Sequence, residues 1–177
     1  MMGAVGTVDD LAAEVAALRR RVEAAEATLA VHELKSRYAE LVDARYDRGR
    51  VVDADRLAAL AEEIAALFTT DAEWDGGPAL GAARGRDAIA ARMRQPTLTF
   101  SRHLFLKPRI GVDGDRAHAR WDLLAPITTP DGRPQWMCGY EDDEYERADD
   151  GRWLHRRMAL TTVFVAPADE GWRRILA

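Results

Sequence analysis

The sequence predicts an α+β fold in which a curved antiparallel sheet, built from a four-strand meander plus one short strand, wraps around helices to form a cone. Two observations predict this class. Apolar residues recur every three or four positions in the first half of the chain and alternate every second position from about residue 101 onward. Helices gathered first and strands gathered afterwards are typical of α+β domains. A strongly bent sheet closed by helices would enclose a cavity.

A heptad-like apolar stripe comes first in the chain. Its members alternate spacings of three and four and are flanked by charged residues: Val8, Leu11, Val15, Leu18, Val22, Ala25 and Leu29. At His32 a new stripe begins out of register, so the helix changes packing partners there. We expect a heptad helix over residues 1–30, a cone domain over 31–166 and a tail over 167–177. The first helix either joins subunits or packs on its own domain, since three heptads are few for an autonomous coil.

Three short elements precede the meander. Asp53 or Asp55 is a suitable cap for a second helix with one apolar face, made of Leu57, Leu60, Ile64 and Leu67. Residues 71–74 are typical of a short strand, and 75–78 of a turn. A third helix is expected to start near Arg86 and to end before Pro96.

Four long strands are expected after the third helix. Turn signals at 113–114, 129–132 and 149–151 separate the segments 101–112, 117–127, 134–147 and 152–165. Each turn signal is short enough for a hairpin. The four strands therefore form an antiparallel meander.

Composition excludes several classes of function. A chain of 177 residues with 47% hydrophobic content suits one domain. Its net charge of −5 argues against nucleic-acid binding, which requires clustered Lys and Arg. Cys138 is the only cysteine, no secretion signal is recognised and no apolar run approaches about 18 residues, so a cytoplasmic protein without a membrane partner is expected.

No cofactor is expected. The four histidines (His32, His103, His118 and His155) are widely separated and no cysteine pair accompanies them, so no metal motif is present. The glycine-containing turns lack the pattern of a phosphate-binding loop.

Three polar residues carry the best chemical signal. Tyr38 and Asp43 lie five positions apart in a predicted helix, and His103 lies on a predicted strand. A hydroxyl, a carboxylate and an imidazole are groups that can remove a proton from one carbon and assist a leaving group on its neighbour. The competing interpretation is structural: a half-buried histidine, a surface carboxylate and a core aromatic. A spacing of five places Tyr38 and Asp43 about 140° apart on an ideal helix, so they do not share one narrow face.

The motifs resemble those of the SnoaL-like branch of the nuclear transport factor 2-like superfamily, in the group of bile acid 7-alpha-dehydratase and scytalone dehydratase. The resemblance covers roughly residues 31–166. It is carried by the segments 33–38, 67–72, 85–89, 110–119 and 139–145, and by Trp153. These motifs are fairly specific for the fold and weaker for the reaction.

The resemblance implies a catalytic core of Tyr38, Asp43 and His103. We expect His103 to act as base and then acid, Asp43 as its partner and Tyr38 as a hydrogen-bond donor. An aspartate and an arginine of the family pattern fall on Ala125 and near Thr162, so both are missing here, and only a different strand register would allow Asp122 and Arg156 or Arg157 to replace them. Six residues are expected to bind substrate: Trp74, Trp121, Asp122, Met137, Tyr140 and Arg156.

The expected activity is that of a cofactor-independent lyase, a dehydratase, or of an isomerase. The resemblance implies a small hydrophobic cyclic substrate of steroid or polyketide type. The alternative is a noncatalytic module of the same fold that binds a small molecule or assembles with partners, because fold does not fix function. A homo-oligomer is expected, with dimer and trimer both open.

Overall fold

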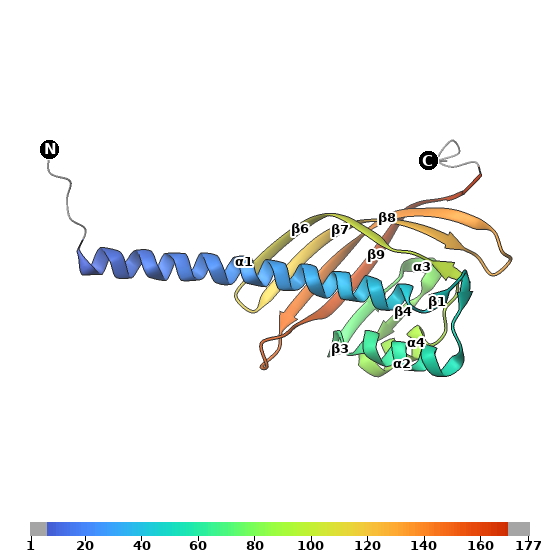
Figure 1. The fold of residues 1–177 in the computed structure, drawn as a ribbon, viewed down its shortest axis with the longest axis horizontal. Coiled ribbons are helices and arrows are strands. Elements are labelled where there is room, and N and C mark those ends of the chain that lie inside the picture. Colours follow the sequence, from blue (N-terminus) through green and yellow to red (C-terminus); the bar gives the residue numbers. More distant parts are fainter. Residues whose placement is uncertain (1–6, 170–177) are drawn as a thin grey trace.

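A computed structural model describes residues 7–169 and is organised around one long helix and one curved sheet (Figure 1). Helix α1 runs without interruption over Val8–Asp43. It begins with a capping box, in which the Thr7 hydroxyl accepts from the Asp10 backbone N–H and the Asp10 carboxylate accepts from the Thr7 backbone N–H. The register change at His32 therefore changes the packing of α1 without breaking the helix.

Three shorter helices and a small hairpin follow α1. The hairpin pairs β1 (Tyr46–Asp47) with β2 (Arg50–Val51). Helix α2 (Ala54–Ala65) is capped by Asp53, whose side chain accepts from the Arg56 backbone N–H at 2.9 Å. It buries three residues of the predicted apolar face, whereas the fourth, Leu67, lies beyond the end of the helix and is half-buried. Helix α4 (Arg86–Met93) confirms the third predicted helix. The expected turn at 75–78 leads into a short helix that was not predicted, α3 (Gly77–Leu80).

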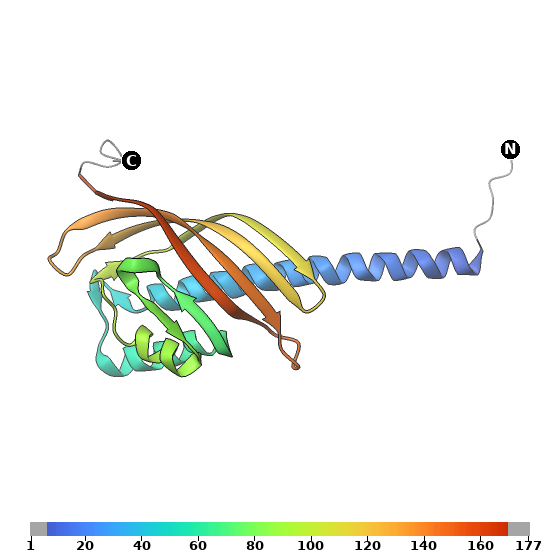
Figure 2. The ribbon, with the colours of Figure 1, turned by 180° about the vertical axis from the view of Figure 1, so that it is seen from behind.

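The predicted meander is present and gives the sheet its shape (Figure 2). Its four long strands are β6 (Leu104–Asp113), β7 (Arg116–Thr128), β8 (Pro134–Arg147) and β9 (Trp153–Pro167). Three short strands extend it: β3 (Phe68–Asp75), β4 (Ala82–Arg84) and β5 (Phe100–Ser101). The order is β4-β3-β9-β8-β7-β5, with β6 also pairing with β7.

One detail of the sheet differs from the expected antiparallel arrangement. Strand β3 pairs with β9 in parallel, and β4 then pairs with β3 in the antiparallel sense. A strand from the helical half of the chain thus closes the free edge of the meander. Sequence periodicity gives the face of each residue but not the direction of a pairing partner far along the chain.

The second half of α1 lies in the concavity of the sheet, where it divides the core in two (Figure 1). One cluster joins α1 to β7 and β8 through Val31, Leu34, Trp121 and Tyr145. The other joins it to α2, β3 and α4, and its members include Tyr38, Leu60, Ile64, Phe68 and Trp74. The predicted cone is confirmed, and its cavity lies where these layers diverge.

The first half of α1 extends beyond the sheet (Figure 1). Its apolar stripe is open to solvent in the single chain, with Leu11 61% and Leu18 46% exposed, and burial begins at Ala27. The stripe therefore does not pack on its own domain, which was one of the two expectations. Of the predicted tail, residues 170–177 lie outside the described residues. Among the described helices, none is sufficiently long and apolar to span a membrane.

Candidate active site

A pocket opens between the end of α1, the α3–α4 segment and the concave face of the sheet. Its walls include Tyr38, Trp74, Leu98, His103, Leu123 and Met137. The cavity has a volume of about 50 Å³, and the empty space reaches about 640 Å³ when solvent at the mouth is included. The cavity is therefore narrow, and a ring compound would have to fit closely or displace side chains at the mouth.

His103 and Asp43 form a hydrogen-bonded pair beside this pocket. The His103 Nδ1 lies 2.7 Å from Asp43 Oδ1, and the same carboxylate accepts from the His103 backbone N–H at 3.0 Å. Because an ionised carboxylate only accepts, this contact places the ring proton on Nδ1 and leaves Nε2 as the nitrogen that can accept another proton. The two side chains are 15% and 5% exposed, so the imidazole reaches solvent and the carboxylate is almost covered.

Asp43 is held in an unusual place for a carboxylate. It is the last residue of α1, where the partial negative charge of the helix end disfavours an anion. The donors from residue 103 and the Arg102 guanidinium, with Nε 3.3 Å from Asp43 Oδ2, offset this cost. The 140° separation between Tyr38 and Asp43 is compatible with a shared site, because only Tyr38 has to line the pocket. Asp43 lies behind His103 and need not reach the cavity.

Tyr38 presents its hydroxyl in a polar corner of the pocket. The hydroxyl accepts a hydrogen bond from the Trp74 indole N–H at 3.1 Å, which leaves its own proton free to donate. Burial, with a further contribution from the Glu141 charge, raises the pKa of Tyr38 well above its ordinary value. The phenol therefore remains a neutral donor across the physiological pH range.

Two arginines also line the pocket. The Arg45 side chain donates to the Val42 carbonyl at 3.0 Å, and Arg92 donates to the Leu80 carbonyl at 2.8 and 3.0 Å. Neither guanidinium pairs with a carboxylate among residues 7–169. The Arg92 guanidinium also lies 5.5 Å from the Trp74 ring. This side of the pocket is thus positively charged.

A buried charge cluster adjoins the opposite side of Tyr38. The Lys35 ammonium donates to Asp143 at 2.7 Å and to Glu141 at closer range, and all three side chains are almost completely buried. The Tyr145 hydroxyl donates to Asp143 at 2.9 Å. Two carboxylates thus share one ammonium group in the interior, and only Glu141 also lines the pocket.

The cluster shifts the ionisation of its members. Burial raises the pKa of Asp143 to about 6, although Lys35 opposes the shift. For Lys35, burial alone would lower the pKa, but the charges of Asp143 and Glu141 outweigh it and raise the pKa. Nearby His155 is fully buried and neither ring nitrogen has a partner among the described residues; burial and then the Lys35 charge hold its pKa well below the ordinary value.

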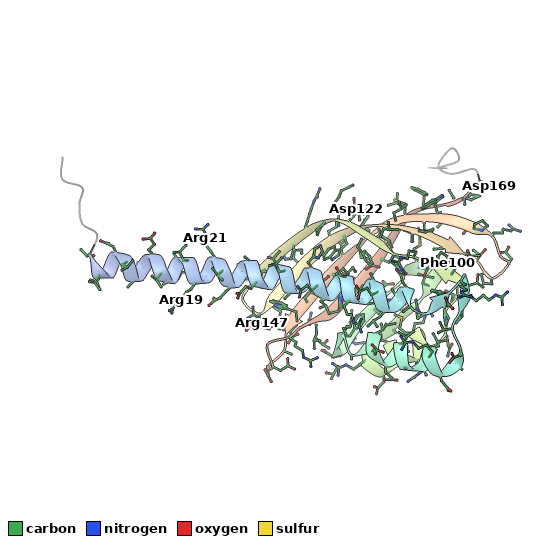
Figure 3. All side chains as sticks on the ribbon, in the orientation of Figure 1. Arg19, Arg21, Phe100, Asp122, Arg147 and Asp169 are labelled. Atoms are coloured by element: carbon green, nitrogen blue, oxygen red, sulfur yellow. The ribbon has the colours of Figure 1, made fainter. Side chains whose placement is uncertain are left out.

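The six residues expected to bind substrate separate into three groups. Trp74 and Met137 line the pocket with His103. Trp121 is buried in the cluster under α1, where its indole donates to Tyr145. The other three lie on the outer face of the sheet: Asp122 pairs with Lys107 at 2.5 Å, Arg156 with Glu144 at 3.1 Å, and Tyr140 lies under Arg120. Asp122 is visible on the convex side in Figure 3.

Strand alternation explains this division. Met137 and Glu141 have the same parity on β8 and face inward, whereas Tyr140 has the opposite parity. Asp122 is likewise separated by one position from inward-facing Leu123. Asp122 and Arg156 therefore do not replace the missing acid and arginine of the family pattern, and Arg157 lies near Glu73 on the outside. The parity of Met137 was the signal that would have found Glu141, which sequence reasoning missed.

Comparison with known proteins agrees with the observed fold. The helices and the bent sheet form a cone with a polar pocket. Residues 23–159 match the SnoaL-like domain family. The chain belongs to that family, within the nuclear transport factor 2-like superfamily, as its motifs indicated. No curated protein matches the sequence.

Several solved structures share the fold. A hexachlorocyclohexane dehydrochlorinase (LinA), type 2, aligns with a TM-score of 0.63 and 21% identity over 80% of this chain and 88% of its own. ActVI-ORFA from Streptomyces coelicolor aligns with a TM-score of 0.58 and 22% identity over 77% of this chain and 97% of its own. A Catenulispora acidiphila protein in complex with S-DNPA aligns with a TM-score of 0.57 and 21% identity over 78% of this chain and 94% of its own. At these identities the likeness concerns the fold.

Proposed function

We propose that the protein is a cofactor-independent lyase that removes water from a small hydrophobic cyclic compound of steroid or polyketide type, or an isomerase using the same groups. The observation that carries the proposal is the 2.7 Å contact between His103 and Asp43 at the edge of a pocket. This contact leaves His103 Nε2 as the base. One neighbour in the fold is a dehydrochlorinase, and its name supports an elimination reaction.

The proposed elimination uses three residues. His103 Nε2 removes a proton from the carbon next to the one that bears the hydroxyl group. The electron pair of that C–H bond forms the double bond, the C–O bond breaks, and the proton returns from His103 to the departing oxygen, so that water leaves. Asp43 stabilises the imidazolium that forms in between, as a triad aspartate does. Tyr38 donates its free proton as a hydrogen bond to a carbonyl or to the leaving oxygen.

A second feature concerns assembly. The exposed stripe on the first half of α1 has the spacing of a coiled-coil seam, with three β-branched valines at one heptad position and Leu11 and Leu18 at the other. We include in the proposal that this stripe joins copies of the chain into a homo-oligomer, either a dimer or a trimer. A cytoplasmic location is proposed from the sequence, because a single cysteine offers no intramolecular disulfide.

The test is direct. The protein is incubated with a panel of hydroxylated cyclic compounds, and products that have lost water are detected by mass spectrometry, with D₂O as solvent to reveal exchange at carbon. We expect His103→Gln to abolish turnover and Tyr38→Phe to reduce it less, since the ring packing survives, with both melting temperatures near that of the parent. If the lost activity only tracks the lost folded protein, the trio is structural and the noncatalytic module replaces the enzyme.

A further inference from the structure

Glu141 is a buried carboxylate in the pocket wall that the proposed reaction does not use. Glu141 is 5% exposed, and its Oε2 accepts a hydrogen bond from the Lys35 ammonium. Its Oε1 accepts no hydrogen bond from any residue between 7 and 169. The space beside Glu141 is the ligand pocket, so this oxygen can accept a hydrogen bond from a group bound there.

Lys35 fixes the position of Glu141. The ammonium is itself fully buried, and it holds Glu141 and Asp143 from the side of α1. A carboxylate that is restrained on one oxygen presents the other in a defined direction. Such an acceptor is already ordered before a ligand arrives, so little conformational entropy is lost on binding.

The surroundings restrict what can bind to Oε1. A carboxylate accepts hydrogen bonds and repels anions. A cationic ligand group would lie in the same narrow pocket as the guanidinium groups of Arg45 and Arg92, which form no ion pair within the described chain. A neutral hydroxyl satisfies Glu141 without conflict with either arginine.

We propose that Glu141 is a substrate-positioning residue, whose free Oε1 accepts a hydrogen bond from a neutral hydroxyl group on the ring compound that occupies the pocket. The inference deepens the proposed function because it concerns the same pocket. It assigns to the substrate a hydroxyl that contacts Glu141. It does not depend on catalysis, because it concerns binding alone.

Asp143 provides a matched control. Glu141 and Asp143 each contribute one carboxylate to Lys35, and removing either one leaves a balanced pair of one ammonium and one carboxylate. Only Glu141 lines the pocket. Glu141→Leu and Asp143→Asn therefore make the same change in buried charge, but only the first removes an acceptor from the ligand. Glu141→Gln, which keeps the shape and a weaker neutral acceptor, is the more conservative companion.

The experiment measures binding of three naphthalene probes by fluorescence titration: 2-methylnaphthalene, 2-naphthalenemethanol and 2-naphthylmethylamine, which carry a methyl, a hydroxyl and an ammonium group on the same ring. In the parent protein we expect the alcohol to bind about tenfold more tightly than the hydrocarbon, as for one hydrogen bond to a charged acceptor. Glu141→Leu should bring the two within about twofold, Glu141→Gln should give an intermediate ratio, and Asp143→Asn should keep the parent ratio.

Three outcomes would overturn the proposal. Equal loss of the alcohol preference in Asp143→Asn and Glu141→Leu would assign the effect to the charge of the cluster. An unchanged preference in Glu141→Leu would assign it to Tyr38 or His103. Tightest binding of the amine would make the site a cation site. Melting temperatures measured on the same samples confirm that each variant is folded. Because no turnover is measured, failure of the lyase proposal would leave these results unchanged.

Discussion

The two halves of α1 have nearly the same apolar spacing and very different surroundings. From Ala27 to Asp43 the helix lies in the concavity of the sheet, and its inward residues are buried. From Val8 onward the equivalent stripe is open to solvent, and charged residues such as Arg19 and Arg21 project around it (Figure 3). Apolar spacing predicts that a face will be covered, but it does not specify whether the cover is the same chain or another.

The difference extends to the polar residues. Lys35, Tyr38 and Asp43 all lie in the buried half, and each one has a defined partner: Asp143, Trp74 and His103 respectively. The exposed half carries charged residues but no buried polar contact. Desolvated groups interact more strongly than solvated ones because water screens them less. Substitutions in the buried half should therefore change chemistry and stability, and those in the exposed half should change assembly.

Among substitutions in α1, Asp43→Asn should give the largest effect on activity. The variant keeps the shape and one acceptor oxygen, but it loses the charge that stabilises a protonated His103. We expect the turnover rate to fall by about 10² to 10⁴, the range for disabling one general acid or base group. The measurement is the steady-state rate on a substrate found in the screen, with Asp47→Asn, on the exposed hairpin, as control. Normal turnover by Asp43→Asn would refute the pair as catalytic.

Lys35→Met should give the largest effect on stability. Without the ammonium, Glu141 and Asp143 are two buried carboxylates with no cation between them. Removing one member of a buried ion pair costs about 3–5 kcal/mol of unfolding free energy. Chemical denaturation of the parent, Lys35→Met and the exposed control Lys107→Met measures the difference. A change below about 1 kcal/mol, the range of surface pairs, would show that the cluster does not need its cation.

Alkaline pH should weaken the fold through the same buried region. Burial raises the pKa of Tyr38 and Tyr145, and the two neighbouring carboxylates raise that of Lys35 despite its burial. The folded protein thus retains protons that the unfolded chain releases above about pH 10, and this contribution to stability is full below that pH and is lost as pH rises.

The slope of the unfolding free energy against pH can be divided among the groups that retain a proton. Each retained proton contributes about 1.4 kcal/mol per pH unit, so Tyr145→Phe should reduce the slope by about that amount. Denaturant unfolding of the parent and the variant between pH 9 and 11.5 provides the comparison. Parallel curves of unfolding free energy against pH for the parent and the variant would mean that Tyr145 loses its proton as readily in the folded state as in the unfolded state.

Most of the fold could be predicted from the sequence, because it depends on local patterns. The Asp53 cap, the Asp113-Gly114 turn and the period-two alternation after residue 101 each describe a few neighbouring residues. The parallel pairing of β3 with β9 was missed because it joins segments about 85 positions apart and leaves no local trace. Pairings of this kind are decided by the assembled core.

The candidate site was accessible only in part. Tyr38, Asp43 and His103 were selected by their chemistry and by resemblance, but the predicted strand 101–112 is wrong at His103, which lies in the link between β5 and β6. The pairing of His103 with Asp43 depends on a contact between this link and the end of α1, 60 positions earlier. Tyr140 and Met137 were both placed in the pocket, although strand alternation permits only one of them to face it. Lys35 was not selected because a lysine on a helix is usually a solvated residue, and only the concavity of the sheet shows that it is buried.

The smallest effect on the cone domain is expected from the exposed half of α1. Leu11→Glu with Leu18→Glu places two charges on the stripe, and Ala13→Glu with Ala24→Glu places two on exposed positions off the stripe. If the stripe joins subunits, light scattering should show a lower mass for the first double variant and the parent mass for the second, because charges at a and d positions disrupt a coiled-coil seam. Neither double variant should change turnover. Neither should change the unfolding free energy of the cone domain by more than about 0.5 kcal/mol. An unchanged mass for the Leu11 and Leu18 variant would place any subunit contact on the sheet instead, and α1 would then need another explanation for its exposed apolar face.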